Sequence, residues 1–304
     1  MTLNTVGVVG ASGNLGAPIV QALLAAGFKV TAITRENSTS TFPDAVEVRR
    51  ANLTSVESLT KAFSGQDVVI ITVATSASGS QIPFIDAAIA AGVKRFIPAE
   101  WGHNTRPGKL NGPLADMLGG KTRTIDYLIE KAKFNPWLTW TGIATSSFFD
   151  WGLDNGKFGI NLATKTATIF DSGNEPASAS TLVFIAQAVV AVLQREHQTA
   201  NQYYDIVEHT FTQNQLLRLF EEETGAKFAV TRASTKDLAV IRDEKITRGD
   251  RSAFLEALFV YSFADGAGNA VNEDDIANGE LGLEGRELRE VVREPAYMEI
   301  VSIE

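Results

Sequence analysis

The most constraining feature of the sequence is a glycine-rich segment between two apolar stretches, VGVVGASGNLGAPIVQALLAAGFKV, at residues 6–30. The first apolar stretch, at 6–9, is rich in β-branched residues and predicts a short buried strand. The stretch at 18–26 has apolar residues at helical intervals and predicts a helix that Gly27 ends. Gly10, Gly13 and Gly16 therefore lie where a strand passes into the N-terminus of a helix.

The position of these glycines indicates an anion site of the dinucleotide-binding type. Unpaired backbone N–H groups and the helix dipole favour a phosphate at a helix N-terminus. A side chain at any of the three positions would hinder the turn, the approach of a pyrophosphate or the packing of helix on strand. The spacing G-x-x-G-x-x-G is one residue longer in its first gap than the usual G-x-G-x-x-G fingerprint. We predict that Gly10–Gly16 binds a dinucleotide, with Ser12, Asn14 and Leu15 beside the glycines. A turn that merely needs glycine is the alternative.

Apolar stretches alternate with helical patterns up to about residue 150. We expect further strands at 30–34, 46–48, 67–73, 94–98 and 138–143. We expect helices between them at 56–63, 81–91 and, after a loop with several Gly and Pro residues, 121–133. This alternation predicts an α/β fold in which helices cover both faces of a parallel sheet. With a glycine-rich loop after the first strand, the unit is of the doubly wound, Rossmann type.

Beyond Trp151 the predicted elements become shorter and more mixed. The clearest are a helix at 182–193, a strand at 203–207 and a helix at 213–223. We therefore predict two domains, a Rossmann-type dinucleotide-binding domain at 1–152 and a smaller C-terminal α/β substrate domain at 153–304. The strand at 203–207 is a candidate to return to the first sheet.

Composition excludes several classes of site and argues against others. The chain of 304 residues has no cysteine, which excludes disulfides, thiolate catalysis and cysteine–zinc sites. Its three histidines, His103, His197 and His209, lack metal-ligand spacing, and we expect no metal. A net charge of −9 argues against a nucleic-acid partner. No stretch approaches the roughly 18 apolar residues of a membrane span, and the N-terminus lacks the pattern of a signal peptide. We expect a cytoplasmic protein.

The end of the second predicted strand indicates which dinucleotide binds. An NAD site usually has Asp or Glu about 20 residues after the glycines, accepting from the ribose hydroxyls. Here Arg35 takes that place, and a guanidinium would pair with the 2′-phosphate of NADPH. Ser38 or Thr39 could add donors. We predict NADPH. Glu36 follows Arg35 directly and could bind the ribose, which keeps an NAD site as an alternative. A second alternative is that Arg35 is an ordinary exposed charge at the end of a strand.

Two candidates for proton transfer lie in the helix predicted at 121–133. Tyr127 and Lys131 match the Y-x-x-x-K of short-chain dehydrogenases. At about 100° per residue, however, they project away from the apolar face that meets the sheet. Lys121 projects within that face and in the first turn, beside the carboxyl ends of the strands. Burial and a positive helix end would both lower the pKa of its ammonium toward a useful acid–base range. A surface lysine after Gly119–Gly120 is the alternative.

A set of motifs in a fixed order runs through nearly the whole chain. They are GASGNLG at 10–16, TRE at 34–36, RFIPAEWG at 95–102, Lys121 and TSSFFDWG at 145–152. Together with the later stretches IFDSGNEPASAS and QYYDIVEHTFTQNQLLRLFEEETG, they resemble the isoflavone reductase-like/NmrA-like group of atypical short-chain dehydrogenases. That group includes phenylcoumaran benzylic ether reductases and pinoresinol–lariciresinol reductases. The sequence is more similar to fungal members than to plant members.

The resemblance implies roles for further residues. It implies a Rossmann domain that holds NADPH and a C-terminal domain that forms one wall of the cleft. It implies that Lys121 is catalytic, that Thr72, Val73 and Ala74 pass the cofactor ribose, and that Phe148 lies near the nicotinamide. Asn52 stands where the family often has Asp, and its amide can still bond an adenine edge.

We expect the substrate to meet residues in loops after the fifth and sixth strands, namely Trp101, His103, Phe149 and Trp151. Aromatic residues at 259, 261 and 263 could approach from the second domain. Such a pocket suits a flat apolar substrate, and ordinary core packing is the alternative for each residue. Glu100 could orient Lys121 or bond backbone N–H groups.

These inferences predict an NADPH-dependent reductase that transfers a hydride to a small aromatic or conjugated substrate. Lys121 would give or take a proton at a substrate oxygen. Two other classes stay open: an NADP(H)-sensing regulator of the NmrA type, which needs neither the lysine nor an aromatic cleft, and a sugar-nucleotide epimerase, which would use the Tyr–Lys pair. The sequence leaves open the substrate and whether the chain forms a homodimer.

Overall fold

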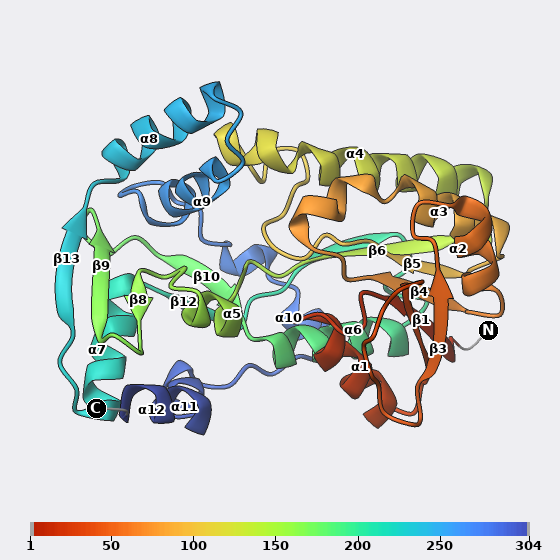
Figure 1. Cartoon of the computed structure of the whole chain (residues 1–304), viewed down its shortest axis with the longest axis horizontal. Coiled ribbons are helices and arrows are strands. Elements are labelled where there is room, and N and C mark those ends of the chain that lie inside the picture. Colours follow the sequence, from red (N-terminus) through yellow and green to blue (C-terminus); the bar gives the residue numbers. More distant parts are fainter. Residues whose placement is uncertain (1–2, 303–304) are drawn as a thin grey trace.

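The fold is built around one seven-stranded parallel sheet, seen in a computed structural model that describes residues 3–302 (Figure 1). The strand order is β11-β6-β5-β4-β1-β2-β3, so the chain starts in the middle of the sheet and winds outward in both directions. The strands are β1 (Thr5–Val9), β2 (Lys29–Arg35), β3 (Glu47–Ala51), β4 (Val68–Ile71), β5 (Arg95–Ile97), β6 (Thr139–Ala144) and β11 (Gln202–Asp205). This arrangement confirms the predicted doubly wound, Rossmann-type fold.

Helices cover both faces of this sheet. On one face lie α1 (Gly16–Ala25) and α6 (Leu182–Gln194), which pack against each other; on the other lie α2 (Val56–Phe63), α3 (Ile82–Ala90) and α4 (Gly112–Phe134) (Figure 1). Because both faces are covered, the central strands are largely apolar, and β4 is apolar and buried at every residue. The carboxyl ends of the parallel strands lie together at one edge of the sheet, next to the buried core.

Helix α4 differs from the prediction in a way that matters for the site. It begins at Gly112, more than two turns before Lys121, with Pro113 in its first turn, where proline fits. Gly119 and Gly120, which predicted a break, lie inside the helix. Gly120 lets α4 approach a 3-10 helix, η1 (Thr75–Ser80), because a Cβ there would lie 2.7 Å from the Cα of Gly79. The prediction that Lys121 lies in a first helical turn is wrong, and the helix dipole does not act on it.

The remaining elements form a smaller part with two three-stranded sheets of order β12-β10-β7 and β13-β9-β8. Its elements are β7 (Ser147–Phe148), α5 (Phe149–Asp154), β8 (Ile160–Asn161), β9 (Thr166–Phe170), β10 (Ala177–Ser180), β12 (His209–Phe211), α7 (Gln213–Thr224), β13 (Ala229–Ala233), α8 (Thr235–Thr247), α9 (Ala253–Phe263), η2 (Glu273–Asp275), α10 (Asn278–Leu281), α11 (Leu288–Val292) and α12 (Pro295–Ser302). Helix α6 and strand β11 return from it to the first sheet. The division into domains at 1–152 and 153–304 stays a proposal, with these two elements as the returning segments.

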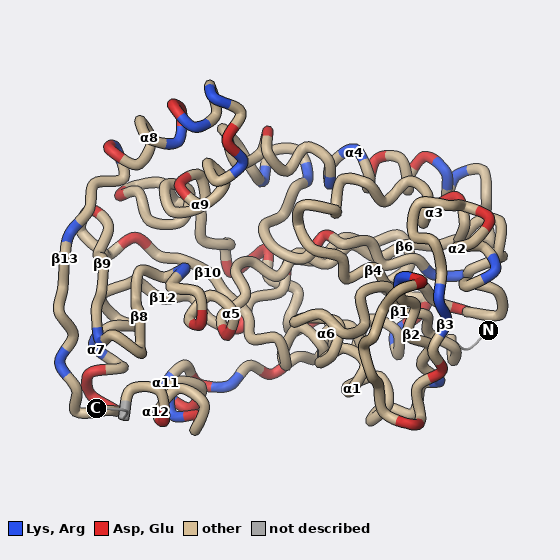
Figure 2. The backbone as a smooth tube through the Cα atoms, in the orientation of Figure 1, with Lys and Arg blue, Asp and Glu red and all other residues tan. Residues whose placement is uncertain are grey.

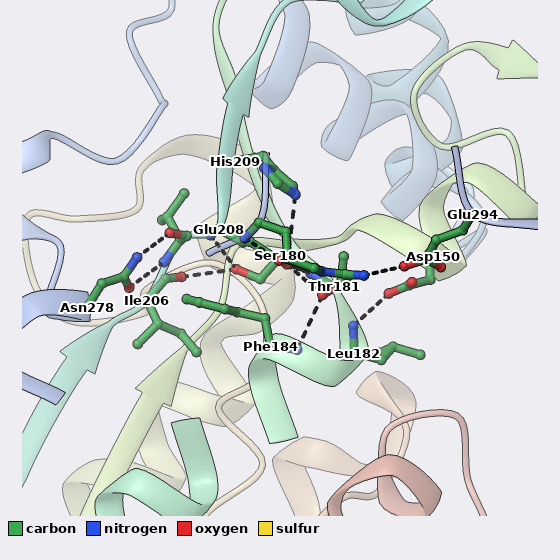
Figure 3. A network of polar contacts seen from close by, with 12 residues as sticks. Asp150, Ser180, Thr181, Leu182, Phe184, Ile206, Glu208, His209, Asn278 and Glu294 are labelled. Atoms are coloured by element: carbon green, nitrogen blue, oxygen red, sulfur yellow. Dashed lines mark hydrogen bonds and ion pairs between the residues drawn. The ribbon is translucent and has the colours of Figure 1, made fainter. Parts of the chain in front are cut away.

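A buried polar network joins the two parts at the N-terminus of α6 (Figure 3). A carboxylate oxygen of Glu208 accepts from the backbone N–H of Thr181 at 3.0 Å and from its hydroxyl at 2.5 Å. Asp150 accepts from the backbone N–H of Leu182 at 2.6 Å. These acidic groups satisfy donors of the first helical turn, which would otherwise be unpaired. The network thereby fixes the segment around Asp150, which leads from β6 into the second part.

Charges are distributed without a face of one sign along the outer helices. Figure 2 shows Lys and Arg interspersed with Asp and Glu on α4 and α8. Within residues 3–302, no helix combines the length and apolar character that a membrane crossing requires.

Candidate functional site

The glycine-rich loop makes the turn between β1 and α1. Gly10 has a φ of 84°, in the left-handed region, and a Cβ there would lie 2.8 Å from the carbonyl oxygen of Thr72. At Gly16, a Cβ would lie 2.1 Å from the carbonyl oxygen of Gly10. Both positions therefore require glycine, one for conformation and one for space. Gly13 is exposed and has an ordinary φ, so its backbone faces outward beside the start of α1.

A cavity of about 450 Å³ lies at the carboxyl edge of the sheet, bounded by the glycine-rich loop, α4 and the second part. This volume is in the range of small-molecule sites. Eleven of the predicted residues line it: Gly13, Asn14, Leu15, Thr72, Val73, Ala74, Trp101, His103, Lys121, Phe148 and Trp151. The structure thus brings the predicted phosphate loop, the proposed catalytic lysine and three aromatic residues to one cavity.

Phe149 is the predicted substrate residue that the structure places elsewhere. It is fully buried in the core of the second part, with its ring 5.7 Å from that of Phe211 and 5.8 Å from that of Phe158. Helix α5 begins at Phe149, so its side chain diverges from that of Phe148. The prediction that Phe149 contacts the substrate is wrong, because its side chain packs within the core of the second part.

Arg35, Ser12 and Asn52, which the sequence predicts to bind the cofactor, are not among the residues that line the cavity. Arg35 ends β2, is exposed and makes no ion pair within the described part of the chain. Ser12 is exposed as well, and its hydroxyl accepts from that of Ser40 at 3.0 Å, which ties the glycine-rich loop to the segment after β2. Asn52 accepts from the backbone N–H and hydroxyl of Thr54 at 3.0 and 2.8 Å, so its amide N–H groups are the ones left for a ligand.

Lys121 is a buried cation with one hydrogen-bond partner among the described residues. Its side chain lines the cavity, the residue is 4% exposed, and Nζ donates to the carbonyl oxygen of Trp101 at 2.7 Å. The indole N–H of Trp101 in turn donates to the carbonyl oxygen of Ile71 at 2.8 Å, which holds this loop against β4. Burial lowers the pKa of Lys121, and the charge of Glu100 opposes that shift.

Glu100 does neither of the two things considered from the sequence. One carboxylate oxygen accepts from the hydroxyls of Thr105 at 2.6 Å and Tyr203 at 2.9 Å, and the other is buried without a hydrogen-bond partner in the described part of the chain. It therefore acts on Lys121 through its charge rather than through a hydrogen bond. Burial, together with Glu100, raises the pKa of Tyr203 well above its ordinary value, so this phenol stays protonated.

His103 lies beside Lys121 in the cavity wall. Its ring packs edge-on against Tyr261, with centroids 4.7 Å apart, and its Nε2 is buried without a hydrogen-bond partner among residues 3–302. Burial and the charge of Lys121 lower the pKa of His103 to about 4. The imidazole is therefore neutral at pH 7, with one N–H donor and one acceptor nitrogen.

The second part contributes residues that the sequence analysis missed. Helix α9 was expected to approach through Phe259, Tyr261 and Phe263, but Phe254 and Leu258 line the cavity. They are four residues apart and share one helix face. Phe259 and Phe263 belong to the opposite side and pack against a core phenylalanine of β9, whereas Tyr261 groups with Phe254 and Leu258 and packs against His103 of the cavity wall. Helical spacing could have grouped Phe254 with Leu258, but it could not tell which face meets the cavity.

The alternative Tyr–Lys pair lies away from the cavity, as its helical projection predicts. The hydroxyl of Tyr127 donates to Asp86 of α3 at 2.7 Å, and the ammonium of Lys131 lies 5.0 Å from the centroid of the Tyr127 ring. Tyr127 therefore takes part in the contact between α3 and α4, and Lys131 lies next to it. They are therefore not in position to act on a molecule in the cavity.

Known proteins that are similar to this chain identify its family. Oxidoreductase poxI from Penicillium oxalicum is 38% identical over 263 residues, which cover 86% of this chain and 83% of that protein. Oxidoreductase aprR from Aspergillus flavus is 35% identical over 295 residues, covering 96% and 98%. The solved structure of AtPrR2 with NADP+ and (+)-pinoresinol shares the fold, with a TM-score of 0.77 at 20% identity over 99% of each chain. The NmrA-like family matches residues 2–265. The chain therefore belongs to the NmrA-like family.

Proposed function

We propose that this protein is an NADPH-dependent reductase of a small aromatic or conjugated substrate, with Lys121 as general acid or base. The observation that carries the proposal is that one cavity is lined both by the exposed backbone at Gly13 and by the buried ammonium of Lys121. The family match, the oxidoreductase relatives and the NADP+ bound to a protein of the same fold support it.

The residues present fit a dinucleotide. Gly10 and Gly16 let the loop pack closely against Thr72 and against itself, and the backbone of Gly13 stays exposed beside the start of α1. Asn14 is exposed at the N-terminus of α1, where N–H groups favour an anion. Arg35 at the end of β2 has no competing carboxylate partner in the described chain and suits a 2′-phosphate.

Bound NADPH supplies the hydride, and the chain's own residues supply position and a proton. An ammonium carries three N–H donors, of which the carbonyl of Trp101 takes one, so two remain for a substrate oxygen. Burial lowers the pKa of Lys121, which makes proton donation to that oxygen easier. Phe148 and Trp151 provide aromatic surface against which a flat substrate can lie. The neutral imidazole of His103 offers a further polar contact.

A turnover screen tests this function. Wild-type protein is incubated with NADPH and a panel of conjugated aromatic carbonyls and phenylpropanoids, and NADPH oxidation is followed. We expect oxidation with at least one compound and a rate about 10²–10⁴-fold lower for Lys121→Met, which keeps most of the side chain and removes the ammonium group. Tight NADPH binding without oxidation by any compound would instead favour a dinucleotide-sensing regulator.

A further inference from the structure

The cavity contains a second lysine that the proposed reaction does not use. Lys157 follows α5 and lines the same cavity as Lys121, and its ammonium lies 4.9 Å from the centroid of the Trp151 ring. The side chain is half-buried, and burial lowers its pKa. Trp151, also in the cavity wall, thus holds the cation in place from one side.

Lys157 lacks the counter-charge that comparable lysines have. Lys94, Lys109 and Lys245 each place Nζ 2.6–2.8 Å from a carboxylate oxygen. Among residues 3–302, no carboxylate pairs with Lys157, and no charged neighbour shifts its pKa. A half-buried ammonium without an anion bears a cost of desolvation that a bound anion would offset.

The charge of the cavity wall also favours a bound anion. The chain carries a net charge of −9. The described wall nevertheless contains two lysines and no Asp or Glu. The loop at 13–15, at the start of α1, is the predicted binding site for the cofactor's phosphates. Lys157 instead comes from the second part, next to the aromatic wall. The cation therefore belongs to the substrate side of the cavity.

We propose that Lys157 binds a carboxylate of the substrate, so that the cavity selects flat aromatic or conjugated acids over their neutral counterparts. This inference rests on the proposed function and names the substrate class for that site. The two lysines then have separate roles. Lys121 is held by a backbone carbonyl beside the reacting oxygen, and Lys157 recognises charge at another point of the same molecule.

A matched pair of probes tests the inference. Trans-cinnamate and trans-cinnamamide have nearly the same shape and differ in charge. Their affinities for the NADP+-saturated protein are measured by calorimetry. We expect wild type to bind cinnamate roughly tenfold or more tightly than cinnamamide, as a charge-assisted hydrogen bond implies. The preference should vanish in Lys157→Met, persist in Lys157→Arg and persist in Lys133→Met, which makes the same change of charge at an exposed position of α4.

Other results overturn the inference. Equal affinities of wild type for the two probes, or failure of both to bind, contradict it. So does a preference that survives Lys157→Met or that Lys121→Met removes instead. Weakened NADP+ binding in Lys157→Met would assign this lysine to the cofactor. NADP+ binding to wild type tests the proposed function separately, and if it fails, the same affinity ratio is measured on the free protein and still decides the inference.

Discussion

At the scale of single residues, Lys121 is the side chain on which the proposed chemistry depends. Its position on the buried face of its helix could be predicted from apolar periodicity, and it is 4% exposed. Its position along the helix could not, because Gly119 and Gly120 predict a break that does not occur. Gly120 allows close packing against η1, a segment that is distant in the sequence. Burial alone therefore accounts for the lowered pKa.

The lowered pKa of Lys121 affects the pH dependence of turnover. A lysine that donates a proton must be charged, so kcat falls as pH rises through its pKa. Because burial lowers the pKa of Lys121 from its ordinary value of about 10.4, we expect the falling limb at a lower pH than an exposed lysine would give. The check is kcat against pH at saturating NADPH. A falling limb of the same midpoint in Lys121→Met would show that another group titrates.

Arg35 determines, on this account, which nicotinamide cofactor binds. It is exposed at the end of β2 and has no ion pair in the described chain, so its guanidinium is available to a 2′-phosphate. We expect NADPH to bind more tightly than NADH, and Arg35→Ala to weaken NADPH binding roughly tenfold to a hundredfold while leaving NADH unchanged. Fluorescence titration with both cofactors measures this. Equal affinities in wild type would contradict the assignment and favour the role of Glu36 in an NAD site.

At the scale of elements, local patterns located most of the first sheet. Strands β1, β2, β4, β5 and β6 follow from short apolar runs, and α2 occupies its predicted residues, 56–63. The wrong start of α4 and the misplaced Phe259 and Phe263 of α9 have a common cause. Both depend on which surface a helix presents to distant segments, and neither glycine content nor helical spacing carries that information.

The contact between α4 and η1 can be tested with two adjacent glycines. A Cβ on Gly120 would lie 2.7 Å from a backbone atom of Gly79, whereas a Cβ on Gly119 would meet only the flexible guanidinium of Arg123, at 3.4 Å. We expect Gly120→Ala to lower the free energy of unfolding by about 1–3 kcal/mol through overpacking. Gly119→Ala should instead leave it unchanged or raise it by up to about 1 kcal/mol, because alanine favours a helix.

Urea unfolding of the two variants measures the difference. Since η1 contributes Thr75 and Ser78 to the cavity wall, Gly120→Ala should also weaken NADPH binding. If Gly120→Ala were as stable as Gly119→Ala, the close approach of these two helices would be refuted.

At the scale of the whole molecule, the site lies where the sheet's carboxyl edge meets the second part. The glycine-rich loop comes from the first residues of the chain, and Phe254 and Leu258 come from α9. The polar network of Glu208, Thr181 and Asp150 fixes the junction between the first sheet and the second part (Figure 3). The glycine-rich loop and the buried position of Lys121 could be predicted because each is marked by a local pattern. The far wall, with Lys157, could not, because it depends on how the two parts pack.

We infer that a dinucleotide lies against the start of α1, and an isosteric substitution at that place tests this inference. Asn14 is exposed and lines the cavity, so Asn14→Asp adds a negative charge without changing shape or core packing. Asn174→Asp makes the same change at an exposed position outside the cavity, where the side chain already acts as an acceptor from Asn214. NADPH binding is measured by fluorescence titration of all three proteins. We predict saturable binding to wild type and to Asn174→Asp, and binding at least about tenfold weaker to Asn14→Asp, because like charges repel at close range. No binding to wild type, or equal binding to both variants, would contradict the account.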